Sequence, residues 1–445
     1  MKISLFGIIW LLAIIISLTK NVKHTMYLLI FSFVFQSAWV IDVAGIDLNA
    51  SLITSVFFII RTLIIKKGRI SIPAWVKYGL AFAFATLIIS FISPQIFEGL
   101  VLRTMTNEGY NFNRIDTVTV SFSFSNLTVG LSVLLYLIDA IMISNIDFSC
   151  CWEQFERIYK NIFLFVLVVG VAHVVFTFFG FPLGLLRELF HNEYQIIGAT
   201  YFDNILLPQY RFARLMSTFY EPSYCGAYIS AALFFIYFSN LQKRNLYLAV
   251  GLVGLLLCMA STGFATLCIV IAIIVIVFAL KRKIPAKFIA SGFVFCLIIC
   301  VLLLSNETIR EVIYSFTLAK FHSDSYDLRS IVNNFSLEAF YKTYGLGVGG
   351  NAVDTYSLFY SLLAQVGVIG TTLYVLFIRN LLHKTTFIRS LKPRWQIVCM
   401  ILSPLVSSLL SCQALNFCVF WMGVCIYALY FSLINNRNEK ELSEL

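Results

Sequence analysis

Two arginines and a glutamate lie close together where a polar segment of this sequence meets an apolar one. Arg211 and Arg214 precede Glu221-Pro222, and the residues after Pro222 are almost all apolar. Proline lacks an N–H group, which the first position of a helix does not need, and it favours an extended residue before it, so we expect a helix to begin at Pro222. Glu221 would then lie at the positive end of the helix dipole. Because guanidinium groups bind phosphate bidentately, the cluster predicts a site for an anionic ligand; the alternative is that the arginines only anchor the chain at a membrane surface.

A second candidate cluster lies far along the chain, around Arg329 and a glycine-rich run, Gly345–Gly350. Successive N–H groups in a glycine turn can wrap an anion, and glycine lets the backbone approach it closely. The run lacks the strand of a dinucleotide-binding fingerprint and the Lys-Ser/Thr of a P-loop. Together with Arg329 it predicts a second anion-binding element; the alternative is a flexible turn before the next helix.

Two carboxylates, Glu221 and Asp354, are each expected at a helix start after an arginine-bearing segment. Such a carboxylate can serve as a general base if partial burial raises its pKa. The alternatives are that Asp354 only caps its helix and that Glu221 only braces an arginine. No cysteine or histidine spacing in the chain indicates a metal site, and we expect neither a metal nor a cofactor.

The composition places this candidate site in a membrane protein. The chain has 445 residues, of which 60% are hydrophobic and only 12% charged. This composition predicts an all-α polytopic membrane protein with a single membrane domain, residues 1–445. The apolar run Ile3–Leu18 is long for a signal peptide and lacks a cleavage site, so we expect it to be a retained first span. The net charge of +10 does not indicate nucleic-acid binding, because the basic residues lie on connections between apolar runs.

Thirteen apolar runs are candidate membrane spans, and we expect about twelve, or eleven to thirteen, transmembrane helices. The runs lie near residues 3–19, 26–45, 48–65, 74–93, 118–143, 161–182, 219–240, 246–260, 262–280, 285–304, 355–378, 397–411 and 415–434.

Most basic residues fall on short connections on one face, which the positive-inside rule makes cytoplasmic. The opposite face carries three long connections, near residues 94–117, 183–218 and 305–354. The last two are the large periplasmic loops that end at the two candidate clusters. In the last, Leu328, Ile331, Phe335 and Ala339 recur at helical spacing, which predicts an amphipathic helix over Ser330–Lys342 lying against the membrane surface or the bundle.

The sequence resembles the bacterial O-antigen polymerases (the Wzy type) in these two loops and in its overall architecture. The first motif is Arg214-x6-Glu221-Pro222-Ser223-x2-Gly226. The second comprises Asp327-x-Arg329, Gly345-Leu-Gly347-Val-Gly349 and Ser357. O-antigen ligases share the architecture but usually carry a His-Asn pair after the glycine turn. This sequence reads Asn351-Ala-Val-Asp354 there, which favours a polymerase over a ligase.

The resemblance implies a glycosyltransferase of lipopolysaccharide or other polysaccharide biosynthesis. In such polymerases two undecaprenyl-pyrophosphate-linked glycans, a donor and an acceptor, meet at the periplasmic face of the bacterial inner membrane. A hydroxyl of one repeat unit attacks the anomeric carbon of the other chain and releases undecaprenyl pyrophosphate. No nucleotide sugar or other cofactor is required. Besides the two glycolipids and the bilayer, a chain-length regulator protein is a candidate partner, and nucleic acid is not.

On this resemblance, Arg214 and Arg329 are expected to bind the departing pyrophosphate, and Glu221 or Asp354 to handle the proton. The residues expected to bind substrate are Arg211, Tyr224, Gly347 and Gly349. Two alternatives stay open: an O-antigen ligase, and a lipid-linked oligosaccharide flippase or transporter without chemistry. A transporter would be expected to show polar residues through the bundle and internal repeats, neither of which is evident in the sequence.

Overall fold

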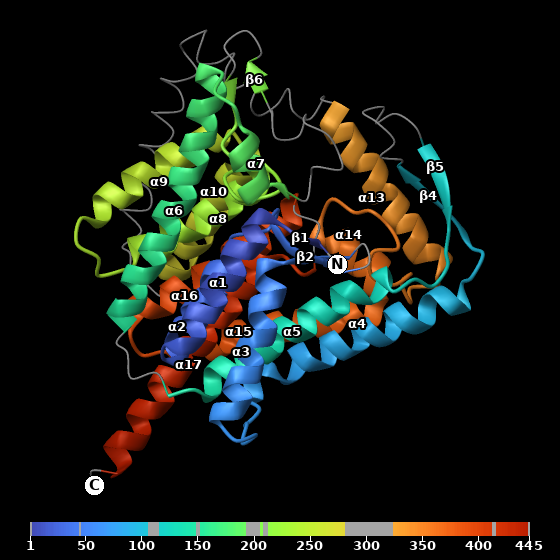
Figure 1. Cartoon of the computed structure of the whole chain (residues 1–445). Coiled ribbons are helices and arrows are strands. Elements are labelled where there is room, and N and C mark those ends of the chain that lie inside the picture. The colour runs from blue at the N-terminus through green and yellow to red at the C-terminus, as the bar shows by residue number, and fades with distance from the viewer. Residues whose placement is uncertain are drawn as a thin grey trace.

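Helices make up most of the chain in the computed structural model (Figure 1). It describes residues 2–43, 46–105, 115–147, 152–192, 205–207, 212–280, 324–411 and 415–443. Among these, six helices are long and apolar enough to cross a membrane. They are α4 with the 3-10 turn before it (Ala74–Ile96), α5 (Ser125–Asn145), α6 (Trp152–Phe179), α10 (Ser261–Leu280), the segment of α14 and α15 (Leu358–Thr385), and α16 (Leu391–Leu410). The chain is therefore a helical multi-pass membrane protein, as its composition predicts.

Several other predicted spans form shorter apolar helices. They are α1 (Leu5–Thr19), α3 (Ala50–Ile65), α8 (Pro222–Tyr237), α9 (Arg244–Cys258) and the apolar part of α17 (Cys418–Ser443). The 16 residues of α8 extend about 24 Å, which is less than the roughly 30 Å of a hydrocarbon core. The number of spans, eleven to thirteen, therefore stays a prediction. The run near 285–304 lies outside the described residues.

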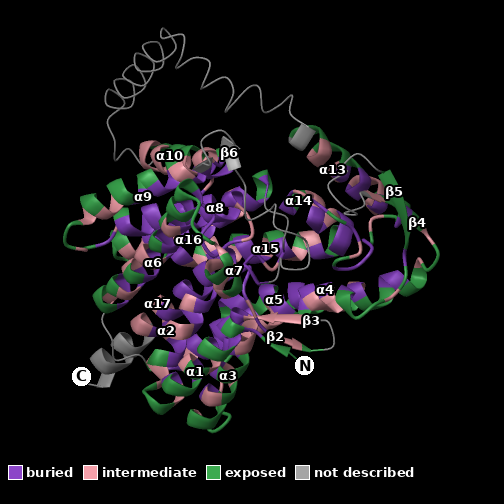
Figure 2. Ribbon diagram, turned by 45° about the horizontal axis from the view of Figure 1, so that its top comes forward, coloured by how far each residue is buried: buried purple, intermediate pink, exposed green. Residues whose placement is uncertain are grey.

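Helix α8 lies at the centre of one half of the bundle, and every residue from Pro222 to Ile236 is buried (Figure 2). It packs against α9, α10 and α16. The small residues predicted to allow close approach do so: a Cβ on Gly226 would lie 3.3 Å from the Cα of Gly263 in α10. The Ser230 hydroxyl donates to the Gly263 carbonyl, with an Oγ–O distance of 2.9 Å. A Cβ at Gly226 would require α10 to move away by a few tenths of an ångström.

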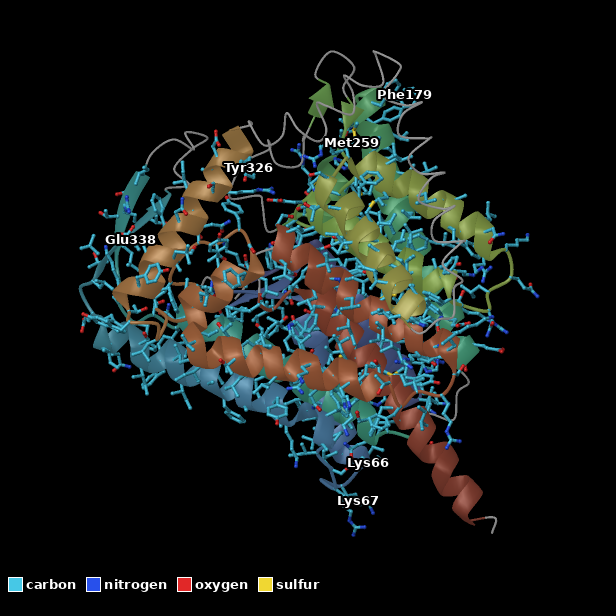
Figure 3. The ribbon with its side chains drawn as sticks, turned by 180° about the vertical axis from the view of Figure 1, so that it is seen from behind. Lys66, Lys67, Phe179, Met259, Tyr326 and Glu338 are labelled. Carbon is cyan, nitrogen blue, oxygen red and sulfur yellow. The ribbon has the colours of Figure 1, made fainter. Side chains whose placement is uncertain are left out.

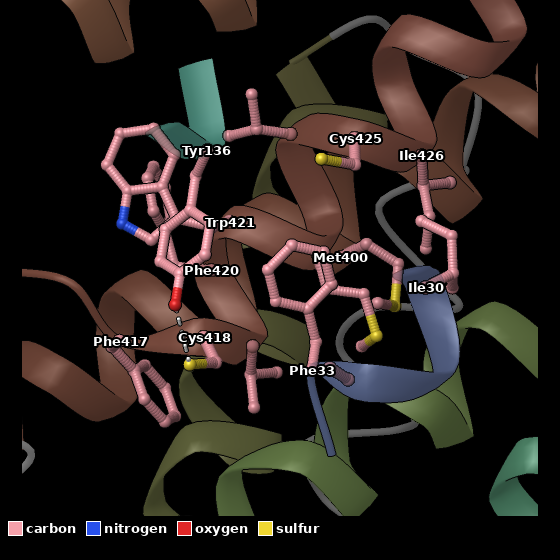
Figure 4. Close-up of a cluster of buried hydrophobic side chains, with 14 of the residues drawn as sticks. Ile30, Phe33, Tyr136, Met400, Phe417, Cys418, Phe420, Trp421, Cys425 and Ile426 are labelled. Atoms are coloured by element: carbon pink, nitrogen blue, oxygen red, sulfur yellow. Dashed lines mark hydrogen bonds between the residues drawn. The ribbon is translucent and has the colours of Figure 1, made fainter. Parts of the chain in front are cut away.

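In the other half of the bundle, α5 packs against α3, α4 and α17 around a cluster of buried aromatic side chains (Figure 4). Tyr136 of α5 and Trp421 of α17 are fully buried there. The Tyr136 hydroxyl lies 3.6 Å from the Cys418 sulfur, so its polar end has a partner inside the apolar cluster. Among the free cysteines of the described helices, Cys268 is exposed and the others are buried, as expected of small side chains packed between helices.

The predicted span over residues 26–45 is wrong. Helix α2 (Val22–Ser32) ends early, and the chain then forms strand β2 (Trp39–Val43), which pairs with β1 (Lys2–Ile3) and β3 (Ile46–Asn49) in an antiparallel sheet. The residues between α2 and β2 bind the segment before α8: the Gln36 N–H donates to the Thr218 carbonyl, 3.2 Å away. These long-range backbone bonds replace the intrahelical bonds that a continuous span would need.

The described parts of all three long connections hold further elements at one end of the molecule. These are the hairpin β4 (Val101–Met105) and β5 (Ile115–Thr119), helix α7 (Gly184–Phe190), strands β6 (Ile205–Leu207) and β7 (Phe212–Ala213), and α13 (Asp324–Lys342). An all-α prediction omits these small sheets. Figure 3 shows Phe179 and Met259 at this end and Lys66 and Lys67 at the opposite one. Long connections and basic turns therefore lie at opposite ends of the bundle.

Candidate functional site

The helix start predicted at Pro222 is correct. Pro222 occupies the first helical turn of α8, and Glu221 before it has extended backbone angles, φ −144° and ψ 159°. The half-buried Glu221 carboxylate does not cap the helix with its side chain; it accepts a hydrogen bond from the Ser223 hydroxyl at 3.0 Å. Its negative charge nevertheless lies at the positive end of the α8 dipole, where it is stabilised.

Arg214 already binds part of the protein. Its Nε donates to the Cys258 carbonyl at 3.3 Å, and its Nη2 donates to the Met259 carbonyl at 3.2 Å. These carbonyls end α9, and a cation at a helix C-terminus is favourable. Met259 itself has a left-handed conformation, φ 45°, which ends the helix. Arg214 therefore holds the end of α9 next to the start of α8.

The guanidinium of Arg214 lies within electrostatic reach of both Glu221 and Arg329. Burial lowers the pKa of Arg214 below its usual range, the Glu221 carboxylate raises it, and the Arg329 charge lowers it again. Arg329 comes from α13, far along the sequence from Arg214. The fold thus brings the two predicted arginine-bearing segments together around one carboxylate.

Tyr356 completes this group, although the sequence analysis did not single it out. The Arg329 Cζ lies 5.7 Å from the centroid of the Tyr356 ring, in a cation–π geometry. Burial raises the pKa of Tyr356, and the Glu221 and Asp354 charges raise it further, while Arg329 lowers it. The Tyr356 N–H donates to the Asn333 side chain of α13 at 3.1 Å, which fixes the ring beside that helix.

Asp354 lies at the edge of the same group. The residue is exposed, yet the protein around its carboxylate raises the pKa of Asp354, and a bond from Thr104 at 3.5 Å opposes the increase. The alternative role of Asp354, as the N-cap of the following helix, is excluded, because Ser357 occupies the N-cap position of α14.

The glycine run forms a tight reversal whose N–H groups are already used. Gly347 and Gly349 have positive φ angles, 84° and 95°. The Gly347 N–H donates to the Thr343 hydroxyl and the Gly349 N–H to the Gln365 carbonyl, at 3.2 and 3.0 Å. The N–H groups at 345, 346, 348 and 350 also donate to protein acceptors. This geometry argues against the predicted phosphate cradle and indicates that the glycines allow close packing on α4 and the π-helical turn Leu362–Val366.

Helix α13 begins before the predicted Ser330 and buries a slightly different face. Phe335 and Ala339 are buried as predicted, but Val332 takes the place predicted for Ile331, whose exposed fraction is 37%. The hairpin β4–β5 is joined to this helix by an ion pair between Arg103 and Glu338. These contacts set the position of α13, and with it Arg329.

One predicted substrate-binding residue, Tyr224, does not add to the group. Tyr224 is only 8% exposed, and its ring packs at 5.3 Å from that of Phe417, which favours a packing role. Arg211 lies outside the described residues. In the described part of the chain, no three His, Cys, Asp or Glu side chains gather in a way that could hold a metal ion.

Comparison with known proteins adds no family assignment. No protein-family model matches the chain, and no curated protein matches its sequence. The fold defines a multi-pass membrane protein with a charged group of residues at one end.

Proposed function

We propose that this protein is a polysaccharide polymerase of the O-antigen type, in the bacterial inner membrane with its active site facing the periplasm. It would join undecaprenyl-pyrophosphate-linked repeat units and release undecaprenyl pyrophosphate. The observation that carries the proposal is the proximity of Arg214 and Arg329. Glu221 offsets one of these two positive charges, and Asp354 lies at the exposed edge of the group, so the two guanidinium groups favour a ligand that carries negative charge.

The main chemical requirement of this reaction is to stabilise the leaving pyrophosphate. It needs no external energy source. The acceptor hydroxyl oxygen forms a bond to the anomeric carbon of the donor, while the bond from that carbon to the pyrophosphate oxygen breaks. The leaving pyrophosphate keeps the electron pair, and the hydroxyl proton passes to a base. Arg329 and the N–H groups of Arg214 that do not bind α9 would hold the developing negative charge.

Two carboxylates are available for the proton. Asp354 reaches solvent and has a raised pKa, which suits a base that must accept a proton and return it to water. Glu221 is closer to Arg214 and is better placed to orient that guanidinium, as its effect on the pKa of Arg214 indicates. Tyr356, beneath Arg329, would keep the second guanidinium aimed at the same point.

Glycolipid analysis in a strain lacking the chromosomal gene tests the proposal. Arg214→Ala and Arg329→Ala should each abolish long polymer and leave single repeat units attached to the lipopolysaccharide core. Arg69→Ala, an exposed arginine at the opposite end, serves as a matched control and should restore normal polymer. Normal chain length in both site variants would exclude the assigned roles. A deletion strain whose cores carry no repeat at all would indicate a ligase instead.

Purified protein distinguishes the polymerase from a transporter. Reconstituted protein mixed with synthetic lipid-linked repeat units should produce lengthened glycans, read by mass spectrometry, without any nucleotide sugar. Movement of the glycolipid across the bilayer with no change in glycan mass would contradict the proposal.

A further inference from the structure

A separate cavity of about 540 Å³ opens at the other end of α8 from the candidate site. Helix α8 starts at the site with Pro222 and ends at Tyr237, just before the connection that forms one wall of the cavity. The other walls are the first turns of α6 and of α9. The lining residues are Glu153, Glu156, Arg157, Lys160, Asn240, Leu241, Gln242 and Tyr247. The volume is in the range of sites for small molecules or lipid headgroups.

Two cations in this cavity have no carboxylate partner among the described residues. Arg157 is exposed, and none of the hydrogen bonds or ion pairs of the described chain involves its side chain. The Lys160 Nζ contacts only a ring face, 5.5 Å from the centroid of Tyr247. Because residues three apart share one face of a helix, both cations point toward the same space.

The acidic residues of the cavity do not cancel all of the positive charge around it. Glu156 is buried and bound inside the protein: Gln396 Nε2 donates to one of its oxygens at 2.7 Å and the Asn240 N–H donates to the other at 3.1 Å. Its role is to fix the connection after α8. Glu153 is exposed and is the remaining free carboxylate of the lining. Glu153 and Glu156 balance Arg157 and Lys160, but Lys392 lies beside them: its Nζ donates to the Asn240 side chain at 2.5 Å and its charge acts on Glu156. One positive charge therefore remains in excess around the cavity.

The surroundings indicate that the anion belongs to a lipid. Further along α9, exposed apolar side chains continue away from the cavity: Leu246 is 53% exposed, Val250 40% and Val253 54%. In a membrane these side chains face acyl chains, and Tyr247 lies at the boundary, where tyrosine is enriched. We propose that this cavity binds the phosphodiester of a glycerophospholipid, with Arg157 and Lys160 on the phosphate and the acyl chains along α9.

Lipid binding to purified protein tests this proposal. Delipidated protein is titrated with short-chain phosphatidylglycerol, and bound lipid is counted by native mass spectrometry. The double variant R157Q/K160Q should bind roughly tenfold more weakly or worse, as expected when two charged hydrogen bonds are lost. K66Q/K67Q removes the same charge from a turn whose residues do not line the cavity, and its lipid binding should be unchanged.

Two results would overturn the proposal. One is equal lipid binding by the two double variants. The other is displacement of the lipid by inorganic phosphate at the same concentration, which would indicate a site for soluble phosphate. The single variant R157E controls for misfolding of the double variant, because Arg157 is exposed. It should also lose lipid binding, and its unfolding temperature should equal that of the unchanged protein.

Discussion

At the scale of single residues, Arg214 and Arg329 differ in what they already bind. Arg214 closes the end of α9 through two carbonyls, whereas Arg329 is held mainly by the face of one tyrosine ring. Charged hydrogen bonds contribute more to stability than a partly exposed cation–π contact. Arg214 therefore combines a structural role with its proposed role, and Arg329 is the better probe of function.

Replacing each arginine by glutamine separates these roles. We expect Arg214→Gln to lower the free energy of unfolding by about 1–3 kcal/mol, because two bonds to α9 weaken. Arg329→Gln should cost less than about 1 kcal/mol. Both should stop polymer formation. Apparent Tm values in detergent, measured beside glycan profiles, check this, and equal losses of Tm would contradict the structural role assigned to Arg214.

The sequence predicts part of this group of residues, although their roles stay a prediction. Arg214, Glu221 and Arg329 were predicted because arginine and glutamate are rare beside apolar helices and therefore noticeable. Tyr356 was missed because aromatic residues are common in this chain, and only its position beneath Arg329 makes it special. The glycine cradle was predicted from composition, which cannot show whether N–H groups are already bound within the protein.

At the scale of elements, the glycine reversal shows how backbone packing sets the position of α13 relative to the membrane helices. A Cβ on Gly347 would lie 2.7 Å from the Gly367 nitrogen and 2.8 Å from the Gln365 carbonyl oxygen. Both neighbours are backbone atoms that cannot move aside. A Cβ on Gly68 would have no neighbouring atom within 4 Å, although the φ angle of Gly68 is also positive, 74°.

This difference predicts unequal costs for two alanine substitutions. Gly68→Ala should lower the free energy of unfolding by about 1 kcal/mol, the usual cost of a left-handed residue with a Cβ. Gly347→Ala should cost about 2–4 kcal/mol, because the backbone must also shift. Thermal unfolding of both variants in the same detergent provides the measurement. A Gly347→Ala protein as stable as Gly68→Ala would show that the reversal is looser than described.

The C-terminal end of α7 is held to the core by the buried residues His191 and Asn192. The His191 Nε2 donates to the Ser217 carbonyl at 2.5 Å, and its Nδ1 lies 3.1 Å from the Ser37 hydroxyl. Burial is the main cause that lowers the pKa of His191 to about 3; the Ser217 bond opposes it, and His173 and Arg187 add to it. The folded protein therefore keeps this ring neutral at pH values where the unfolded chain protonates it.

The consequence is a loss of stability in mild acid. Because the pKa of His191 is lower in the folded state, its stabilising effect is complete above about pH 6.5 and falls as the pH drops toward 3. Between pH 7 and pH 5 we expect a loss of about 2 kcal/mol. His191→Gln should show a shallower pH dependence of Tm, whereas His383→Gln, at an exposed histidine, should follow the unchanged protein. Equal slopes for all three proteins would exclude this role.

Elements with a strong apolar pattern were predicted best. The start of α8 and the close approach at Gly226 followed from proline and small-residue spacing. The predicted span over 26–45 is wrong because hydrophobicity alone cannot separate a membrane helix from a strand, and Trp39–Val43 is rich in strand-forming residues. Its pairing partners include residues 2 and 3, a contact that local patterns cannot reveal.

At the scale of the whole molecule, the two ends of the bundle differ in how they use charge. The turns at one end carry many basic residues, among them the exposed Lys67 and Arg69, although Arg244 there donates to the Tyr237 carbonyl. The arginines at the other end are engaged: Arg103 binds Glu338, Arg214 binds α9, and Arg329 lies over Tyr356. Basic residues on exposed turns orient a membrane protein, because these turns stay on the cytoplasmic side. The arginines at the other end contact other parts of the folded protein.

This asymmetry predicts the orientation on which the proposed reaction depends. An epitope tag inserted after Lys67 should be reached by antibody only after the inner membrane is permeabilised. A tag inserted within residues 106–114, between β4 and β5, should be reached in intact spheroplasts. The opposite pattern would place Arg214 and Arg329 in the cytoplasm, away from lipid-linked repeat units that have already crossed the membrane. Because the tags lie outside the candidate site, the polymer profile of each tagged protein confirms that the labelled molecules are folded and active.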